Sequence, residues 1–161
     1  MNDKPKKIVI IGPESTGKST LAACLARDFK TVFVPEYARA YLERKNAPYD
    51  HRDLLEIAKG QLASEEKISE KSRNGLLFCD TDLYVIKVWS EHKYGQCDTF
   101  ILEEIARRSY DFYLLTDIDM VWTDDPLREH PQPEMRRYFF RVYHDIVQNS
   151  GRPWTLIKGR P

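Results

Sequence analysis

Cysteines and long apolar runs are scarce in this sequence, and their scarcity excludes whole classes of protein. Three cysteines among 161 residues, with no Cys-x-x-Cys pair, make no disulfide framework, and the four histidines lack the spacing of a zinc site. No stretch approaches the roughly 20 apolar residues of a membrane-spanning helix, and the polar start MNDKPKK has no signal-peptide pattern. We therefore expect a reducing, cytoplasmic setting and no membrane partner.

An excess of charge of either sign is also missing. The 25 basic and 25 acidic residues give a formal net charge of +0, so any recognition of phosphate has to be local. The nine tyrosines are scattered and form no stacking platform for single-stranded nucleic acid. We expect no nucleic-acid partner and, from the length, a single domain over residues 1–161.

The stretch KIVIIGPESTGKST at residues 7–20 is the most informative part of the chain. The apolar run at 8–11 predicts a buried parallel strand, and residues 21–29 predict a helix. Between them, the pattern Gly-x-x-x-x-Gly-Lys-Ser is filled by Gly12, Gly17, Lys18 and Ser19. This strand–loop–helix order is the context in which the pattern forms a phosphate-binding loop (P-loop).

The chemistry of a P-loop explains this spacing. The two glycines allow consecutive backbone N–H groups to turn inward around a polyphosphate, and the start of the helix adds further N–H donors. Lys18 can reach the β- and γ-phosphate oxygens, and the Ser19 hydroxyl can bind Mg²⁺. The alternative is a glycine turn that happens to carry Lys-Ser.

Strand-like and helix-like segments alternate along the rest of the chain. The expected strands are at 8–11, 31–34, 76–79, 112–115 and 154–157, and helical patterns occupy 37–46, 54–72, 82–92, 100–106 and 135–147. This alternation predicts an α/β fold with a five-stranded parallel sheet and helices on both faces. In such folds ligands bind beyond the carboxyl ends of the strands.

Acidic residues follow the second and third expected strands. Asp80 ends an apolar strand, as a Mg²⁺-binding carboxylate would, although a solvated strand-end Asp is the simpler alternative. Glu36 can accept a hydroxyl proton during phosphoryl transfer, or can interact with the dipole of the helix that it precedes. Arg39, one turn later, can pair with Glu36 or with a substrate. Asp117 follows the fourth expected strand.

Residues 119–137 form a proline-rich, charged segment that we interpret as a lid. Phosphoryl transfer needs a cation near the transferring group and exclusion of water, and Arg128 can supply the cation, with Arg136 and Arg137 as alternatives. The competing interpretation is an exposed loop whose Trp122 anchors it to the core. Further predictions place Tyr138, Phe139 and Tyr143 together in the core and the run at 65–73 on a solvated helix surface.

Four blocks together resemble a known family: GPESTGKST at 12–20, VPEYAR at 34–39, FCDTD at 78–82 and DFYLLTDIDMVWTDDPLR at 111–128. They are similar to the kinase domain of the bacterial bifunctional nicotinamide-mononucleotide adenylyltransferase/ribosylnicotinamide kinase of the NadR type, from about residue 7 to about residue 145. The P-loop alone is shared by many families, whereas the other three blocks are specific as a set.

The resemblance implies ATP- and Mg²⁺-dependent phosphorylation of the ribose 5′-hydroxyl of nicotinamide riboside. It assigns ATP to Gly12, Glu14, Ser15, Thr16, Gly17, Lys18, Ser19 and Thr20. It assigns the riboside to Glu36, Tyr37, Arg39, Asp80 and Asp82, and the lid to Trp122, Asp124, Asp125 and Arg128. We expect the adenylyltransferase domain of that family to be missing from this chain.

Other functions remain compatible with the sequence. The acceptor can be another nucleoside or a vitamin alcohol, because a kinase without the adenylyltransferase domain is free to change substrate. An ATP-dependent regulatory switch is a second alternative; a GTPase switch is not, because no Asn-Lys-x-Asp block is present. A nucleoside-monophosphate or shikimate-like kinase would need more acceptor-site arginines, for which Arg39 and Arg44 are available.

Overall fold

The computed structural model describes residues 3–159 as a five-stranded parallel sheet with the strand order β2-β3-β1-β4-β5. The strands are β1 (Lys6–Ile11), β2 (Phe33–Val34), β3 (Leu76–Asp80), β4 (Phe112–Thr116) and β5 (Trp154–Ile157). The helices are α1 (Lys18–Asp28), α2 (Tyr37–Lys45), α3 (His51–Ser69), α4 (Leu83–Tyr94), α5 (Thr99–Arg107) and α6 (Pro133–Gln148). The α/β fold predicted from the alternation of segments is confirmed.

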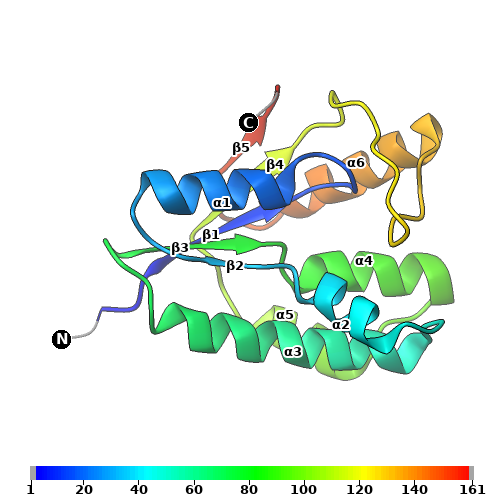
Figure 1. Cartoon of the computed structure of the whole chain (residues 1–161), viewed down its shortest axis with the longest axis horizontal. Helices are drawn as coiled ribbons and strands as arrows, with labels where there is room; N and C mark the ends of the chain where they lie inside the picture. Colours follow the sequence, from blue (N-terminus) through cyan, green and yellow to red (C-terminus); the bar gives the residue numbers. More distant parts are fainter. Residues whose placement is uncertain (1–2, 160–161) are drawn as a thin grey trace.

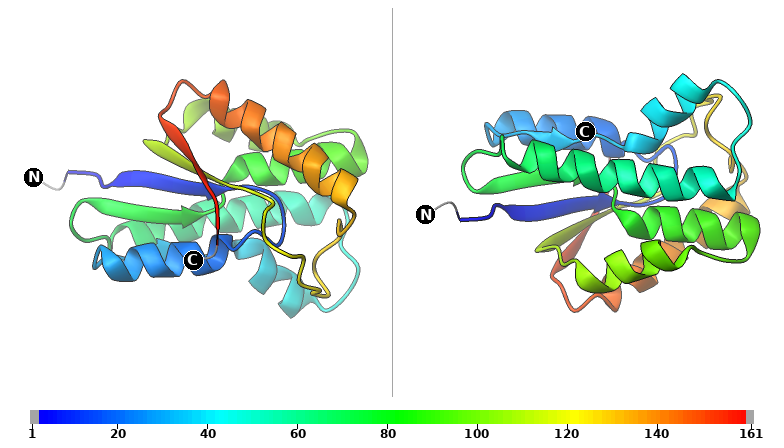
Figure 2. Two further views of the ribbon diagram at one scale, coloured as in Figure 1. Left: turned by 90° about the horizontal axis from the view of Figure 1, so that it is seen from above. Right: turned by 90° about the horizontal axis from the view of Figure 1, so that it is seen from below.

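Helices cover both faces of the sheet. Figure 1 shows α1 on one face and α3, α4 and α5 on the other, and Figure 2 shows the second group side by side from below. The chain leaves β1 toward β2, returns through β3 and then crosses to β4, so the direction of winding reverses at β1. In open parallel sheets this reversal creates a crevice at the carboxyl ends of the strands.

The core is built where the sequence is most apolar. Val9, Ile10 and Ile11 of β1 are fully buried, and they pair with β3 on one side and β4 on the other. A central strand with neighbours on both edges and helices on both faces has no solvent-exposed side, which explains its uninterrupted apolar run. This rigid centre fixes the position of the loop that follows Ile11.

The structure corrects the expected boundary of the lid. Residues 117–132 are irregular apart from short turns, but α6 begins at Pro133, so residues 133–137 form the first turn of a helix. Proline is favoured at this position because the first helical N–H has no intrahelical partner and the fixed φ of proline suits the helix. The name lid is used below for the irregular segment 117–132, which keeps the predicted segment up to the start of α6.

Two expectations about burial are wrong in part. Tyr138 is 43% exposed, whereas Phe139 and Tyr143 are buried, so Tyr138 lies at the solvent edge of the buried face of α6. Glu65 is only 3% exposed although it begins the run assigned to solvent. It continues the buried face of α3, where Lys7 Nζ lies 3.4 Å away and the Tyr110 hydroxyl donates a 3.1 Å hydrogen bond.

Two further observations concern the expected setting of the chain. All three cysteines are free. None of the helices in residues 3–159 combines the length and the apolarity needed to cross a membrane.

Candidate active site

The P-loop joins β1 to α1 and depends on two glycines for different reasons. At Gly12 an added Cβ would lie 2.2 Å from Thr116 Oγ1 and 2.9 Å from the Thr116 carbonyl oxygen, so the loop crosses β4 too closely for any side chain. Gly17 precedes α1 with φ of 81°, a left-handed conformation that favours glycine. These two positions turn the chain back toward the sheet before the helix starts.

Lys18 points back into the loop, as a phosphate-binding lysine should. Its ammonium donates a 2.7 Å hydrogen bond to the Pro13 carbonyl oxygen. Burial lowers the pKa of Lys18, while the nearby carboxylates of Glu36, Asp80 and Glu14 act in the opposite direction and favour its charged form. The ammonium is thus held at the loop by a single carbonyl and faces acidic neighbours.

Ser19 and Asp80 meet at the start of α1. The Ser19 hydroxyl donates a 2.6 Å hydrogen bond to Asp80 Oδ2. The other carboxylate oxygen of Asp80, Oδ1, is buried without a hydrogen-bond partner in residues 3–159, and burial raises the pKa of Asp80. An unpartnered buried oxygen beside a serine hydroxyl fits a Mg²⁺ ion, which takes few protein ligands when phosphate oxygens complete its shell.

Glu36 lies across the cleft from the P-loop, where it was expected. It occupies the N-cap position of α2, yet its side chain makes no capping hydrogen bond. Burial raises the pKa of Glu36, and the charge of Lys18 partly offsets this rise. A carboxylate that is not used as a cap, faces Lys18 and has a raised pKa is suited to receive a proton from a substrate.

Beyond Glu36 the cleft continues into a pocket whose residues the sequence interpretation missed. One wall is a stripe on α4 formed by Val85, Val88, Trp89 and His92. Phe139 and Tyr143 of α6 also line the pocket, and the Phe139 ring centroid lies 4.9 Å from that of His92. Ala38 and Leu42 of α2 and the lid residues 127–130 complete the lining. The spacing of the α4 stripe directly after Asp80 is a helical signal that could have identified this wall.

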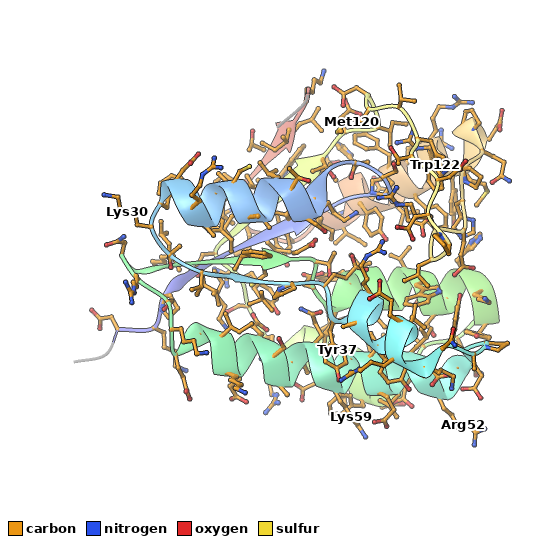
Figure 3. All side chains as sticks on the ribbon, in the orientation of Figure 1. Lys30, Tyr37, Arg52, Lys59, Met120 and Trp122 are labelled. Carbon is orange, nitrogen blue, oxygen red and sulfur yellow. The ribbon has the colours of Figure 1, made fainter. Side chains whose placement is uncertain are left out.

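The lid lies against the P-loop through several hydrogen bonds. The Thr123 N–H donates to Ser15 Oγ at 2.9 Å, and the His130 N–H donates to a Glu14 carboxylate oxygen at 3.1 Å. Asp125 forms a 3.0 Å ion pair with Arg39 of α2. Figure 3 labels Met120 and Trp122 on this segment, beside the loop that precedes α1. The segment predicted as a lid therefore lies against the P-loop.

Two arginines accompany the lid, and they take different positions. Arg128 lines the cleft, as expected of a cation for phosphoryl transfer, and its guanidinium donates to the Thr123 carbonyl oxygen. Arg136 does not line the cleft; it donates to the carbonyl oxygens of Met120 at 3.1 Å and Ser15 at 3.3 Å. Arg136 thus connects the lid to the P-loop through hydrogen bonds to both segments. Arg137 lies on the surface of α6, 3.7 Å from Glu134.

The structure places Asp82 outside the cleft. Asp82 is 2% exposed and caps α4 by accepting a 3.0 Å hydrogen bond from the Tyr84 N–H, and the Tyr113 hydroxyl donates to it at 3.2 Å. Burial raises its pKa to about 7. Between the two acids, Thr81 adopts φ of 72° and reverses the chain, so that Asp80 faces the P-loop while Asp82 faces the interior below α4.

Tyr37 is likewise a packing residue rather than part of the cleft lining. Its ring lies against α3, where a Cβ added to Gly60 would be 2.0 Å from Tyr37 Cε1, and Figure 3 shows it between α2 and α3. Its hydroxyl accepts a 3.1 Å hydrogen bond from Arg44. The sequence interpretation grouped it with Glu36 and Arg39, but the helical turn directs it to the opposite side.

Three of the expected lid residues shape the lid and do not line the cleft. The Trp122 indole N–H donates to Asp124 at 2.9 Å, and the guanidinium groups of Arg128 and Arg136 lie 5.9 and 5.7 Å from the Trp122 ring centroid. Asp125, besides its ion pair with Arg39, accepts a 2.9 Å hydrogen bond from the Leu127 N–H. Their common effect is to hold Arg128 at the edge of the cleft.

Comparison with known proteins agrees with this arrangement. Residues 7–161 match a family model described as an AAA domain. The trifunctional NAD biosynthesis/regulator protein NadR of Salmonella typhimurium is 26% identical over 157 residues, which are 95% of this chain and 38% of that protein. The chain thus spans well under half the length of this curated relative.

Solved structures share the fold. A NadR protein in complex with NAD and AMP-PNP has a TM-score of 0.75 at 22% identity, covering 97% of this chain and 45% of that one. A NadR protein in complex with NR has a TM-score of 0.74 at 24% identity, covering 97% and 46%. Thymidylate kinase from Candida albicans reaches 0.64 at 16% identity, covering 98% and 86%.

The resemblance to the kinase part of NadR, first seen in four short blocks, is therefore confirmed over nearly the whole chain. With its P-loop, its parallel sheet and a family match over residues 7–161, the chain belongs to the AAA-domain family.

Proposed function

We propose that this protein is an ATP- and Mg²⁺-dependent kinase that phosphorylates the 5′-hydroxyl of nicotinamide riboside. The observation that carries the proposal is the position of Glu36. Its carboxylate makes no capping hydrogen bond and faces Lys18 across a cleft. This cleft lies between the P-loop and a pocket lined by aromatic residues. A nucleotide switch that only hydrolyses ATP has no use for such a pocket beside its catalytic groups.

The proposed reaction assigns one task to each group. The P-loop N–H groups and Lys18 bind the β- and γ-phosphates. Ser19 and Asp80 would hold Mg²⁺, which would neutralise charge on the phosphates. The riboside hydroxyl attacks the γ-phosphorus, the bond from that phosphorus to the β-phosphate oxygen breaks, and ADP leaves. Glu36 accepts the hydroxyl proton, and Arg128 stabilises the transferring group while the lid excludes water.

The charges of the pocket favour a nucleoside over an acceptor that already carries phosphate. Such an acceptor would need arginines besides Arg128, which the proposal assigns to the transferring group. Arg39 is paired with Asp125, and Arg44 lies outside the cleft against Tyr37. The pocket instead offers aromatic faces, Trp89 and Phe139, together with the acidic Glu129. Aromatic faces and carboxylates suit a positively charged ring such as the pyridinium of nicotinamide riboside.

Two comparisons add support for this acceptor. The relative from Salmonella typhimurium is named a NAD biosynthesis protein, and one NadR structure of the same fold holds NR. Transfer of that substrate to this chain remains our proposal, because the chain spans only part of those proteins.

The proposal is tested by measuring ADP release from MgATP in the presence of a panel of alcohols. We expect turnover with nicotinamide riboside and formation of the mononucleotide, detected by mass spectrometry. Turnover with a different nucleoside or vitamin alcohol alone would replace the substrate and retain the kinase. Slow ATP hydrolysis that no alcohol accelerates would instead support a regulatory switch.

A further inference from the structure

A single hydroxyl joins the wall of the acceptor pocket to the lid. Tyr49 lies in the connection between α2 and α3, and its hydroxyl accepts hydrogen bonds from the Trp89 indole N–H at 3.0 Å and from Lys93 Nζ at 2.7 Å. It donates its own proton to the Glu129 carboxylate. Trp89 belongs to the pocket wall on α4, whereas Glu129 belongs to the lid.

We propose that Tyr49 is a positioning residue that couples acceptor binding to lid closure through this hydroxyl. The proposal rests on the proposed kinase function, because it concerns the acceptor pocket of that reaction.

The Tyr49 hydroxyl makes every hydrogen bond that a phenol can make. A phenol has one O–H donor and two acceptor lone pairs, and here Glu129, Trp89 and Lys93 take all three. Burial and the neighbouring Glu129 carboxylate raise the pKa of Tyr49, so the proton that bonds the lid is retained at neutral pH. Lys93 Nζ also lies 3.5 Å from the other carboxylate oxygen of Glu129, so Tyr49, Lys93 and Glu129 all contact one another.

The ring of Tyr49 fixes geometry as well. It meets the Trp89 ring edge-on with centroids 5.0 Å apart, and the Lys93 ammonium lies 4.0 Å from its centroid on the face of the ring. These contacts set the angle at which Trp89 presents itself to the pocket. An acceptor that contacts Trp89 therefore acts on the same group that holds Glu129.

The lid end of this connection reaches the P-loop directly. The N–H groups of Glu129 and His130 donate to the Glu14 carboxylate at 3.1 to 3.2 Å. Without the Tyr49 hydroxyl, the Glu129 side chain loses its donor on the α2–α3 connection, and the Trp89 N–H is left without its partner. We then expect weaker acceptor binding, together with a lid that opens more often and admits water to the γ-phosphate.

The test compares wild type with Tyr49→Phe, which keeps the ring and removes only the hydroxyl. We expect KM for the alcohol to rise roughly tenfold, the size of effect typical for loss of a charge-assisted hydrogen bond, while Kd for MgATP changes by less than about twofold. Hydrogen exchange at the amides of Glu129 and His130 should accelerate, and acceptor-independent ADP release should increase, because the lid is less firmly held.

Control variants separate this role from a general loss of stability. Tyr94→Phe removes a hydroxyl from the same neighbourhood of α4 that makes no hydrogen bond within residues 3–159, and it should leave KM and lid exchange unchanged. Glu129→Ala, at an exposed position, breaks the same bond from the lid side. Because Glu129 also lines the acceptor pocket, the double variant is compared by lid exchange and not by KM. If this bond holds the lid, Tyr49→Phe combined with Glu129→Ala should accelerate lid exchange no more than the stronger single variant.

Two results would overturn the proposal: unchanged exchange of the lid amides in Tyr49→Phe, or fully additive effects on lid exchange in the double variant. Absence of turnover with every alcohol would refute the proposed function instead. In that case the exchange experiment, which needs no acceptor, still decides whether Tyr49 holds the lid.

Discussion

Replacing Glu36 by glutamine tests the proposed chemistry most directly. Glutamine keeps the size and hydrogen-bonding reach of the side chain but cannot accept a proton as a carboxylate does. A positioned general base contributes about 10²- to 10⁴-fold to a rate. Since each tenfold change corresponds to about 1.36 kcal/mol, the expected loss in transition-state stabilisation is about 2.7 to 5.4 kcal/mol.

The same substitution should affect nucleotide binding little. Glu36 faces Lys18, and removing its negative charge takes away a group that would repel the γ-phosphate. We therefore expect Kd for MgATP, measured by calorimetry, to stay unchanged or to decrease slightly while kcat falls. This separation of kcat from Kd distinguishes a base from a residue that only shapes the loop.

The pH profile provides an independent measurement. Burial raises the pKa of Glu36, and the reaction needs its deprotonated form, so kcat/KM should fall as the pH drops through that raised pKa. The fall should begin at a higher pH than the usual glutamate value of about 4.3 implies. Glu36→Gln should lack this acidic limb. A variant with nearly normal kcat and an unchanged profile would refute Glu36 as the base.

Three further substitutions test other parts of the structure. Lys18→Ala should lower kcat on the order of 10²- to 10³-fold, as loss of one transition-state donor does, and should weaken MgATP binding in calorimetry. Asp82→Asn keeps the cap of α4 but cannot ionise. Because the folded-state pKa of Asp82 is raised to about 7, the folded protein holds a proton that the unfolded chain has released, so wild-type stability falls as pH rises. Urea titrations should show the advantage of Asn growing between about pH 4 and pH 7, by at most about 1.4 kcal/mol per pH unit, and then levelling off. Gly60→Ala should destabilise the fold by about 1 to 3 kcal/mol, because its methyl group would collide with the Tyr37 ring; an unchanged Tm would contradict that packing.

The sheet and the P-loop could be predicted because their signals are local. The apolar run of β1 and the fixed spacing of Gly12, Gly17 and Lys18 each require only neighbouring residues to be interpreted. The meeting of Glu36 with Lys18 and Asp80 was also predictable, because parallel strands bring their carboxyl ends to the same edge.

The direction of individual side chains was harder to predict. Tyr37 and Glu36 are adjacent in sequence, yet only Glu36 lines the cleft, because Tyr37 is drawn into the contact between α2 and α3. Asp82 was assigned to the substrate on resemblance, although an aspartate directly before an apolar helical run is a capping signal. The hydrogen bonds between lid and P-loop join residues more than 100 positions apart, which no local pattern reports.

The side of the pocket formed by α4 has an evolutionary consequence. One helix, α4, carries Val85, Val88, Trp89 and His92, and it supplies neither the P-loop nor the three carboxylates near Lys18. Under the proposed kinase function, substitutions at these few positions of α4 would change the alcohol that the pocket accepts. The P-loop and the carboxylates near Lys18 would stay unchanged, so related proteins could acquire new substrates without altering the phosphate-binding site.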